Sequence, residues 1–120
     1  MQVTQCLHTA VLVADLERAE HFYTTVLGLS KVERPLKYPG MWYQIGAFQL
    51  HLIVDPAFEA TQQNSEKWGR NRHLAFGVTN LKAARERLCS HGYDVQMSAS
   101  GRAALFTQDP DGNVVEISEV

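Results

Sequence analysis

The sequence is short of cysteine and of basic residues, and both shortages narrow the possible functions. Its two cysteines, Cys6 and Cys89, lie far apart and form no CxxC pair, so we expect free thiols in a reducing cytoplasm rather than a disulfide framework. Eleven lysines and arginines stand against 13 acidic residues, which gives a net charge of −2. Because the chain has no basic field, we expect neither a nucleic-acid partner nor an anionic-lipid partner.

Long hydrophobic runs are also missing. No apolar stretch approaches the roughly 20 residues that a membrane-spanning helix needs. The N-terminal residues show no signal-peptide pattern. Hydrophobic residues still make up 45% of the 120 residues, as in ordinary globular proteins of one domain. We therefore expect a cytoplasmic, single-domain protein without a membrane partner.

The chain contains an internal repeat. Five identical pairs recur at a constant offset of 65 residues: His8 and His73, Ala10 and Ala75, Val13 and Val78, Leu16 and Leu81, Ala19 and Ala84. In both copies a helix N-cap residue, Asp15 or Asn80, follows the first strand, and a helix-stopping glycine, Gly28 or Gly92, follows the helix. A duplicated module explains this recurrence better than chance.

Each copy is predicted to fold as a βαβββ module. The first strands are predicted at 7–13 and 74–78, and amphipathic helices follow from Leu16 and Leu81. Further strands, separated by turn residues, are predicted at 29–33, 41–45, 48–54, 94–97, 103–108 and 114–119. Module one spans about 5–55 and module two about 72–120, and a polar linker with room for one helical turn spans about 56–71.

These elements predict an α+β fold. One module has a single helix to cover its sheet and would bury little apolar surface alone. Two βαβββ modules can pair into a curved mixed sheet that encloses a central cup, with the helices outside. The repeat therefore predicts a binding site inside that cup.

Strand alternation selects the side chains that face the cup. His8 and His73 each share a strand face with small residues, which leaves room for a ligand. Glu116 lies on an apolar strand, where a carboxylate is costly to bury unless it is paired or bound to a metal. On the corresponding strand of module one, Gln49 and His51 share a face. The candidates that face the cup are His8, Gln49, His51, His73 and Glu116.

Two histidines and a carboxylate are suitable ligands for one divalent metal ion, with Ni, Zn, Mn, Co and Fe(II) all compatible. Open coordination positions would accept two substrate oxygens, and the metal would act on them as a Lewis acid. The symmetric placement of His8 and His73 on repeated strands, together with the inward Glu116, favours metal binding over a purely structural role.

The sequence resembles the vicinal-oxygen-chelate superfamily, which includes glyoxalase I, methylmalonyl-CoA epimerase, extradiol dioxygenases and bleomycin-resistance proteins. The segment LHTAVLVADLERAEHFYTTVLGL resembles the opening of the first module, and RHLAFGVTNLKAARERLCSHGYDV resembles that of the second. FTQDPDGNVVEISEV is similar to the closing strand with its preceding turn. The resemblance covers nearly the whole chain and is more specific for the fold than for the reaction.

The resemblance implies a metal-ligand set of His8, Gln49, His73 and Glu116, with His51 as a competitor of Gln49 for the fourth position. Glyoxalase I commonly has glutamate where this chain has Gln49, which leaves Glu116 as the only ligand carboxylate and the catalytic residue. The epimerases match the ligand set better, but they carry a second glutamate where this chain has 41–44, MWYQ.

The resemblance thus implies a metal-dependent glyoxalase-like lyase or isomerase that acts on a small substrate with vicinal oxygens. Two alternatives stay open: a metal-free small-molecule binding or resistance protein, and an Fe(II) extradiol-type dioxygenase. Four residues are candidates for substrate binding: Trp42, Tyr43, His51 and Arg102. Family members of this size commonly form homodimers, so we expect a homodimer, with the site built within one chain or across two.

Overall fold

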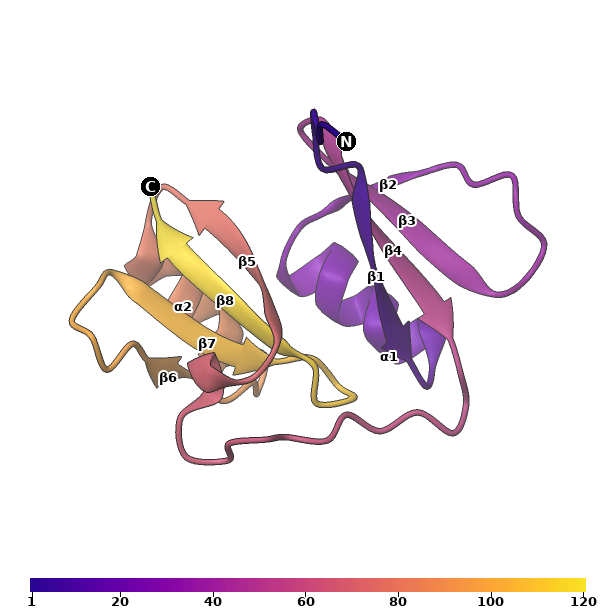
Figure 1. The fold of residues 1–120 in the computed structure, drawn as a ribbon. Helices are drawn as coiled ribbons and strands as arrows, with labels where there is room; N and C mark the ends of the chain where they lie inside the picture. Colours follow the sequence, from indigo (N-terminus) through magenta and orange to yellow (C-terminus); the bar gives the residue numbers. More distant parts are fainter. The chain divides into compact units, whose positions relative to one another are not determined.

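The computed structural model describes all residues, 1–120. The chain divides into two compact units, Met1–Phe58 and Glu59–Val120. Each unit is a βαβββ module with its own four-stranded mixed sheet (Figure 1). The predicted fold class, α+β with two βαβββ modules, is confirmed. None of the helices is both long enough and apolar enough to cross a membrane.

The first module has the strand order β1-β4-β3-β2. Its strands are β1 (His8–Val13), β2 (Ser30–Val32), β3 (Gly40–Ile45) and β4 (Phe48–Val54). β1 runs parallel to β4, and the other neighbouring pairs are antiparallel. A parallel pair cannot be joined by a tight hairpin, so the chain crosses over through a helix between β1 and β2. This parallel pairing places the first and last strands of the module side by side.

The helix of the first module begins as an α-helix and ends as a π-helix. Asp15 caps α1 (Leu16–Glu20) by accepting a hydrogen bond from the backbone N–H of Arg18 at 3.0 Å. The following segment, η1 (His21–Val26), is wound as a π-helix, in place of the single α-helix that the sequence predicts. The wider turn places Phe22, Tyr23 and Val26 together in the core.

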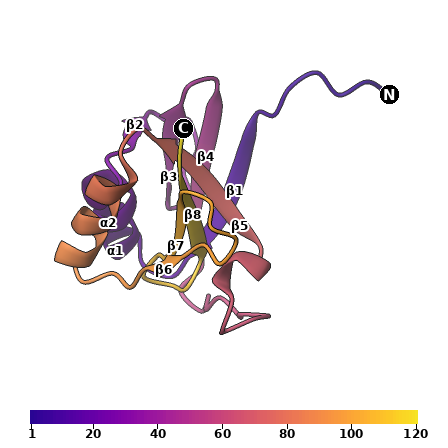
Figure 2. The same cartoon turned by 90° about the vertical axis from the view of Figure 1, so that its left-hand side faces the viewer.

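The second module repeats this topology, with the strand order β5-β8-β7-β6. Its elements are η2 (Trp68–Arg70), β5 (His73–Val78), α2 (Leu81–Ser90), β6 (Gln96–Met97), β7 (Ala104–Gln108) and β8 (Val114–Glu119). Figure 2 shows α2 on one side of its own sheet. Asn80 caps α2 through the Ala83 N–H at 3.0 Å, and Glu119 accepts a hydrogen bond from the Leu81 N–H at 2.9 Å. The single turn of η2 is the helical turn for which the linker has room.

The core of the first module lies between the sheet and the helix. Tyr43, Leu50 and Leu52 point to the helix side of the sheet and are at most 1% exposed. The Tyr43 hydroxyl lies 2.8 Å from the Thr24 hydroxyl on η1. Burial raises the pKa of Tyr43 above its ordinary value, and the negative charge of Glu20 adds to the rise, while the hydrogen bond to Thr24 opposes it. The buried hydroxyl thus connects the sheet to the helix.

Replacing Tyr43 with phenylalanine tests this connection. We expect Tyr43→Phe to lower the free energy of unfolding by about 1 kcal/mol at neutral pH, because one part-buried hydrogen bond is lost. The folded chain binds the Tyr43 proton more tightly than the unfolded chain, so stability falls as the pH rises from the ordinary tyrosine value towards the raised one.

That alkaline loss should be smaller in Tyr43→Phe. Urea denaturation at neutral pH and above pH ~10 measures both effects. Tyr38→Phe is the matched control because Tyr38 is 49% exposed. Equal stability of Tyr43→Phe and Tyr38→Phe at both pH values would contradict the proposed connection.

Candidate functional site

Three rings are stacked on the face of the first sheet opposite its helix. Across the β1–β4 pair, His8 lies beside Gln49 and Ala10 lies beside His51. Across the β3–β4 pair, His51 lies beside Trp42. The ring centroids of His8 and His51 are 4.2 Å apart, and those of His51 and Trp42 are 4.0 Å apart. The planes within each pair are tilted by 13° and 6°. His51 is therefore held between two parallel aromatic surfaces.

A directed chain of hydrogen bonds fixes which nitrogen of His51 carries the proton. The Gln44 side-chain N–H donates to the Gly46 carbonyl at 2.7 Å, and the Gln49 side-chain N–H donates to Gln44 Oε1 at 2.8 Å. Gln49 Oε1 then lies 2.8 Å from His51 Nε2. Because the Gly46 carbonyl can only accept, each link has one direction, and His51 Nε2–H must donate to Gln49. The Nδ1 lone pair of His51 is left for a ligand.

The surroundings of His51 favour its neutral form. Burial lowers the pKa of His51, and the positive charges of His8 and Arg34 lower it further. A neutral imidazole is the form that binds a metal ion. His51 is therefore prepared as a lone-pair donor.

The second module presents a histidine and a carboxylate on one face. His73 Nε2 lies 4.0 Å from Glu116 Oε1. His73 Nδ1 lies 2.7 Å from the Asn71 carbonyl, which can only accept, so Nδ1–H donates to that carbonyl. The Phe106 and His73 rings meet edge to face, with the centroids 5.4 Å apart. Nε2, the other ring nitrogen of His73, thus lies on the side of Glu116.

Two polar side chains offset the cost of burying Glu116. Glu116 is 8% exposed, and its Oε1 accepts a hydrogen bond from Arg102 Nη2 at 3.1 Å. Ser118 donates its hydroxyl to Oε2 at 3.1 Å. The Arg102 side chain is 58% exposed, so it reaches the carboxylate from the solvent side. Each carboxylate oxygen of Glu116 therefore accepts one hydrogen bond.

His51 and Glu116 occupy equivalent positions in the two modules. His51 pairs with Ala10 across the parallel β1–β4 ladder, and Glu116 pairs with Ala75 across the parallel β5–β8 ladder. Both pairs follow the repeat offset of 65, because 75 minus 10 and 116 minus 51 give the same number. Gln49 corresponds instead to Val114. Of the two candidates for the fourth donor position, His51 is the register counterpart of Glu116.

The structure brings most predicted site residues onto two module faces. His8, Gln49, His51 and Trp42 share a face in the first module, and His73, Glu116 and Arg102 are grouped in the second. Tyr43 does not join them, because it points into the core on the helix side. Neither module alone gathers three His, Cys, Asp or Glu side chains in a metal-binding arrangement.

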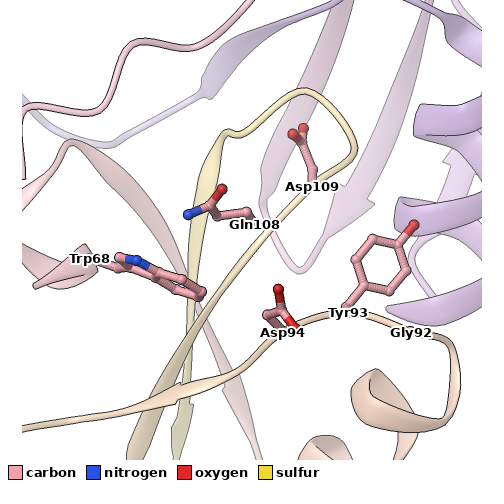
Figure 3. A pocket seen from close by; sticks show the side chains of 6 residues that line it. All are labelled: Trp68, Gly92, Tyr93, Asp94, Gln108 and Asp109. Carbon is pink, nitrogen blue, oxygen red and sulfur yellow. The ribbon is translucent and has the colours of Figure 1, made fainter. Parts of the chain in front are cut away.

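A cavity of about 220 Å³ lies elsewhere in the second module (Figure 3). Its lining consists of Trp68, Gly92, Tyr93, Asp94, Gln108 and Asp109. The Asp109 carboxylate is occupied by its own turn, where it accepts hydrogen bonds from the backbone N–H groups of Asp111 and Asn113 and from the Asn113 side chain. No predicted site residue lines this cavity.

Three residues that support the site are absent from the sequence prediction: Gln44, Asn71 and Ser118. Strand alternation could have identified Gln44 and Ser118. Gln44 pairs with Gln49 in the neighbouring strand, and Ser118 lies two residues from Glu116 on the same strand face. Asn71 precedes its strand and carries no pattern. Its role depends on contacts with residues 63–68, which no periodicity reveals.

The chain matches known proteins over nearly its whole length. The sequence profile of the Glyoxalase/Bleomycin resistance protein/Dioxygenase superfamily matches residues 5–117. The chain is 30% identical to a lactoylglutathione lyase of Salmonella typhimurium, over 94% of this chain and 90% of that one. It is 28% identical to the human mitochondrial methylmalonyl-CoA epimerase, over 93% of this chain and 72% of the relative.

The fold has a close counterpart among solved structures. A glyoxalase/dioxygenase from Nostoc punctiforme superposes with a TM-score of 0.79 at 24% identity. The likeness covers 96% of this chain and 90% of the other. At that identity the likeness concerns the fold.

Replacing Asn71 tests the anchor that orients His73. The Asn71 side chain is 8% exposed and makes four hydrogen bonds: it accepts from the N–H groups of Gln63 and Asn64 and donates to the carbonyls of Asn64 and Trp68. We expect Asn71→Ala to lower the free energy of unfolding by about 2 kcal/mol, because buried backbone groups lose their partners. Urea denaturation measures the loss.

Gln63→Ala is the control, since it keeps the backbone N–H that Asn71 binds and changes only an exposed side chain. If Asn71→Ala were as stable as Gln63→Ala, Asn71 would not anchor this segment.

Proposed function

The chain belongs to the glyoxalase/bleomycin resistance protein/dioxygenase superfamily, and we propose that it is a metal-dependent lyase or isomerase of the glyoxalase type. Its substrate would be a small molecule with two adjacent oxygens. The observation that carries this proposal is that each module presents a histidine, His51 or His73, with one ring nitrogen held by a hydrogen bond and the other left for a ligand. Histidine ligands of metals are held in the same way.

The proposed ligands are His8, His73 and Glu116, with the fourth donor from the Gln49–His51 pair. The ligand set draws on both modules, from one chain or from two copies in a homodimer. Register equivalence with Glu116 supports His51 as the fourth donor, with Gln49 holding its ring through Nε2. Ni, Zn, Mn, Co and Fe(II) all accept imidazole and carboxylate donors.

A bound divalent cation would supply Lewis-acid polarisation of the substrate oxygens. Glu116 is the only carboxylate of the proposed set, so it is the residue that would take up and return a proton between adjacent carbons. Arg102 and Ser118 each contact one of its oxygens and would keep the carboxylate oriented. Trp42 would form an apolar wall beside His51.

The names of the relatives support a reaction of this class. The lactoylglutathione lyases and the methylmalonyl-CoA epimerase are named as a lyase and an epimerase that act on small molecules. Neither Gln49 nor His51 is a carboxylate, so the fourth donor position separates this chain from the usual glyoxalase I pattern. We therefore propose a class of substrate, small molecules with two adjacent oxygens.

Metal binding is the first test of the proposed function. Protein purified without chelator should carry close to one equivalent of a divalent metal. At free metal about 100-fold above Kd, the free energy of unfolding should rise by about 2.7 kcal/mol. His73→Ala and Glu116→Gln should lose this rise, whereas His91→Ala, at an exposed position, should keep it.

Elemental analysis and thermal unfolding with Ni(II), Zn(II) or Mn(II) measure these effects. A metal content near zero, together with an unchanged unfolding temperature on adding metal, would contradict the proposal and favour a metal-free binding protein. Oxygen uptake with catechols on the Fe(II)-loaded protein would favour a dioxygenase instead.

The fourth donor has a test of its own. His51→Phe keeps a ring of similar shape between His8 and Trp42 but removes both ring nitrogens. We expect Gln49→Ala to weaken metal binding by about 10–100-fold, because it removes a contact that supports the His51 ring. His51→Phe should weaken metal binding more, because it removes the donor itself. Calorimetric titration of the variants measures the order. The reverse order would assign the fourth position to Gln49.

A further inference from the structure

An arginine on the first module has two N–H groups without an acceptor. Arg34 follows β2, and its Nε and Nη2 are buried from solvent and have no hydrogen-bond partner. The remaining nitrogen, Nη1, makes one long hydrogen bond of 3.5 Å to the Leu36 carbonyl. None of the ion pairs in the chain includes Arg34. Buried donors without partners are rare in folded proteins and require an explanation.

The two free donors lie on one edge of the guanidinium. Nε–H and the neighbouring Nη2–H point side by side in the same plane. This edge matches the two oxygens of a carboxylate or a phosphate, which an arginine binds through two parallel hydrogen bonds. The unpartnered groups of Arg34 therefore form a complete fork for an oxyanion.

Neighbouring residues hold the guanidinium over the open face of the sheet. A Cβ atom at Gly40 would lie 3.1 Å from Arg34 Nη2 and 2.4 Å from the Leu52 carbonyl oxygen, so the guanidinium occupies space that only glycine leaves free. The Tyr38 ring lies 4.9 Å from Arg34 Cζ. Gly40 shares its strand face with Trp42, which pairs with His51. Arg34 thus belongs to the ring-bearing face.

The segment between β2 and β3 has no regular structure, and no carboxylate fixes the guanidinium there. Because Nε and Nη2 are buried, an oxyanion reaches this edge only when the side chain moves.

We propose that Arg34 is an anion-binding residue, which receives a carboxylate or phosphate group on the ring-bearing face of the first sheet through the Nε–Nη2 edge of its guanidinium. This assignment goes beyond the proposed metal chemistry and does not depend on it. If both hold, the substrate carries an anionic group in addition to its two adjacent oxygens.

A structural arginine and an anion-binding arginine differ in what their removal does to stability. A buried charge without a partner is unfavourable to the folded state, so its replacement by an uncharged residue is neutral or stabilising. We therefore expect Arg34→Gln to be at least as stable as the wild type in urea denaturation without added oxyanion. A loss of stability, or a failure to fold, would assign a structural role to Arg34 and overturn the proposal.

Binding is tested on metal-free protein with inorganic phosphate and with acetate as probes. NMR titration should shift the Arg34 Nε–H signal of the wild type, and the probe that shifts it at the lower concentration identifies the preferred oxyanion. Arg34→Gln should bind that probe about tenfold or more weakly, because a charge-assisted fork is lost. Arg34→Lys, which keeps the charge but not the fork, should fall between the two.

Arg85→Gln is the matched control, since it removes an exposed arginine on α2. It should bind like the wild type. No shift of the Arg34 signal with either probe, or equal binding by Arg34→Gln and Arg85→Gln, would overturn the proposal. Because no metal is added, failure here is separate from failure of the metal-binding test.

Discussion

The parallel pairing of the first and last strands in each module is the constraint on which the candidate site depends. Parallel neighbours require a crossover, and the helix that makes it covers one face of the sheet. The other face is left for function. The same ladders align Ala10 with His51 and Ala75 with Glu116, so a small side chain lies beside each polar group. Strand pairing therefore decides both where the site is and how much room it has.

Backbone carbonyls determine how two histidines of the candidate site donate hydrogen bonds. The carbonyls of Gly46 and Asn71 can only accept hydrogen bonds, and each determines which ring nitrogen of a histidine donates, directly or through two glutamines. The imidazoles are thus oriented by the main chain of the fold rather than by acidic neighbours. A main-chain carbonyl does not change its protonation state, so the acceptor that holds each ring stays the same as the pH changes, unlike a carboxylate.

The sequence alone predicts most of the fold. The bounds of β4 and β8 match the predicted strands at 48–54 and 114–119, because alternation and turn residues define them. Hydrophobic spacing did not reveal the π-helical end of the first helix. Strand alternation also places Tyr43 and Trp42 on opposite faces of the sheet, because neighbours in a strand point to opposite sides. The fork of Arg34 depends on which groups lack a partner, which no residue pattern encodes.

The π-helical turn has a consequence for the history of the two modules. The repeat offset is 65 from His8 to Ala19, but Gly28 and Gly92 are only 64 apart (92 minus 28), and the offset returns to 65 at His51 and Glu116. Relative to the second helix, the first contains one extra residue before its glycine. A π-turn absorbs a single insertion without breaking the helix. After duplication, the copies could therefore diverge in helix length while the strands that carry His51 and Glu116 stayed in register.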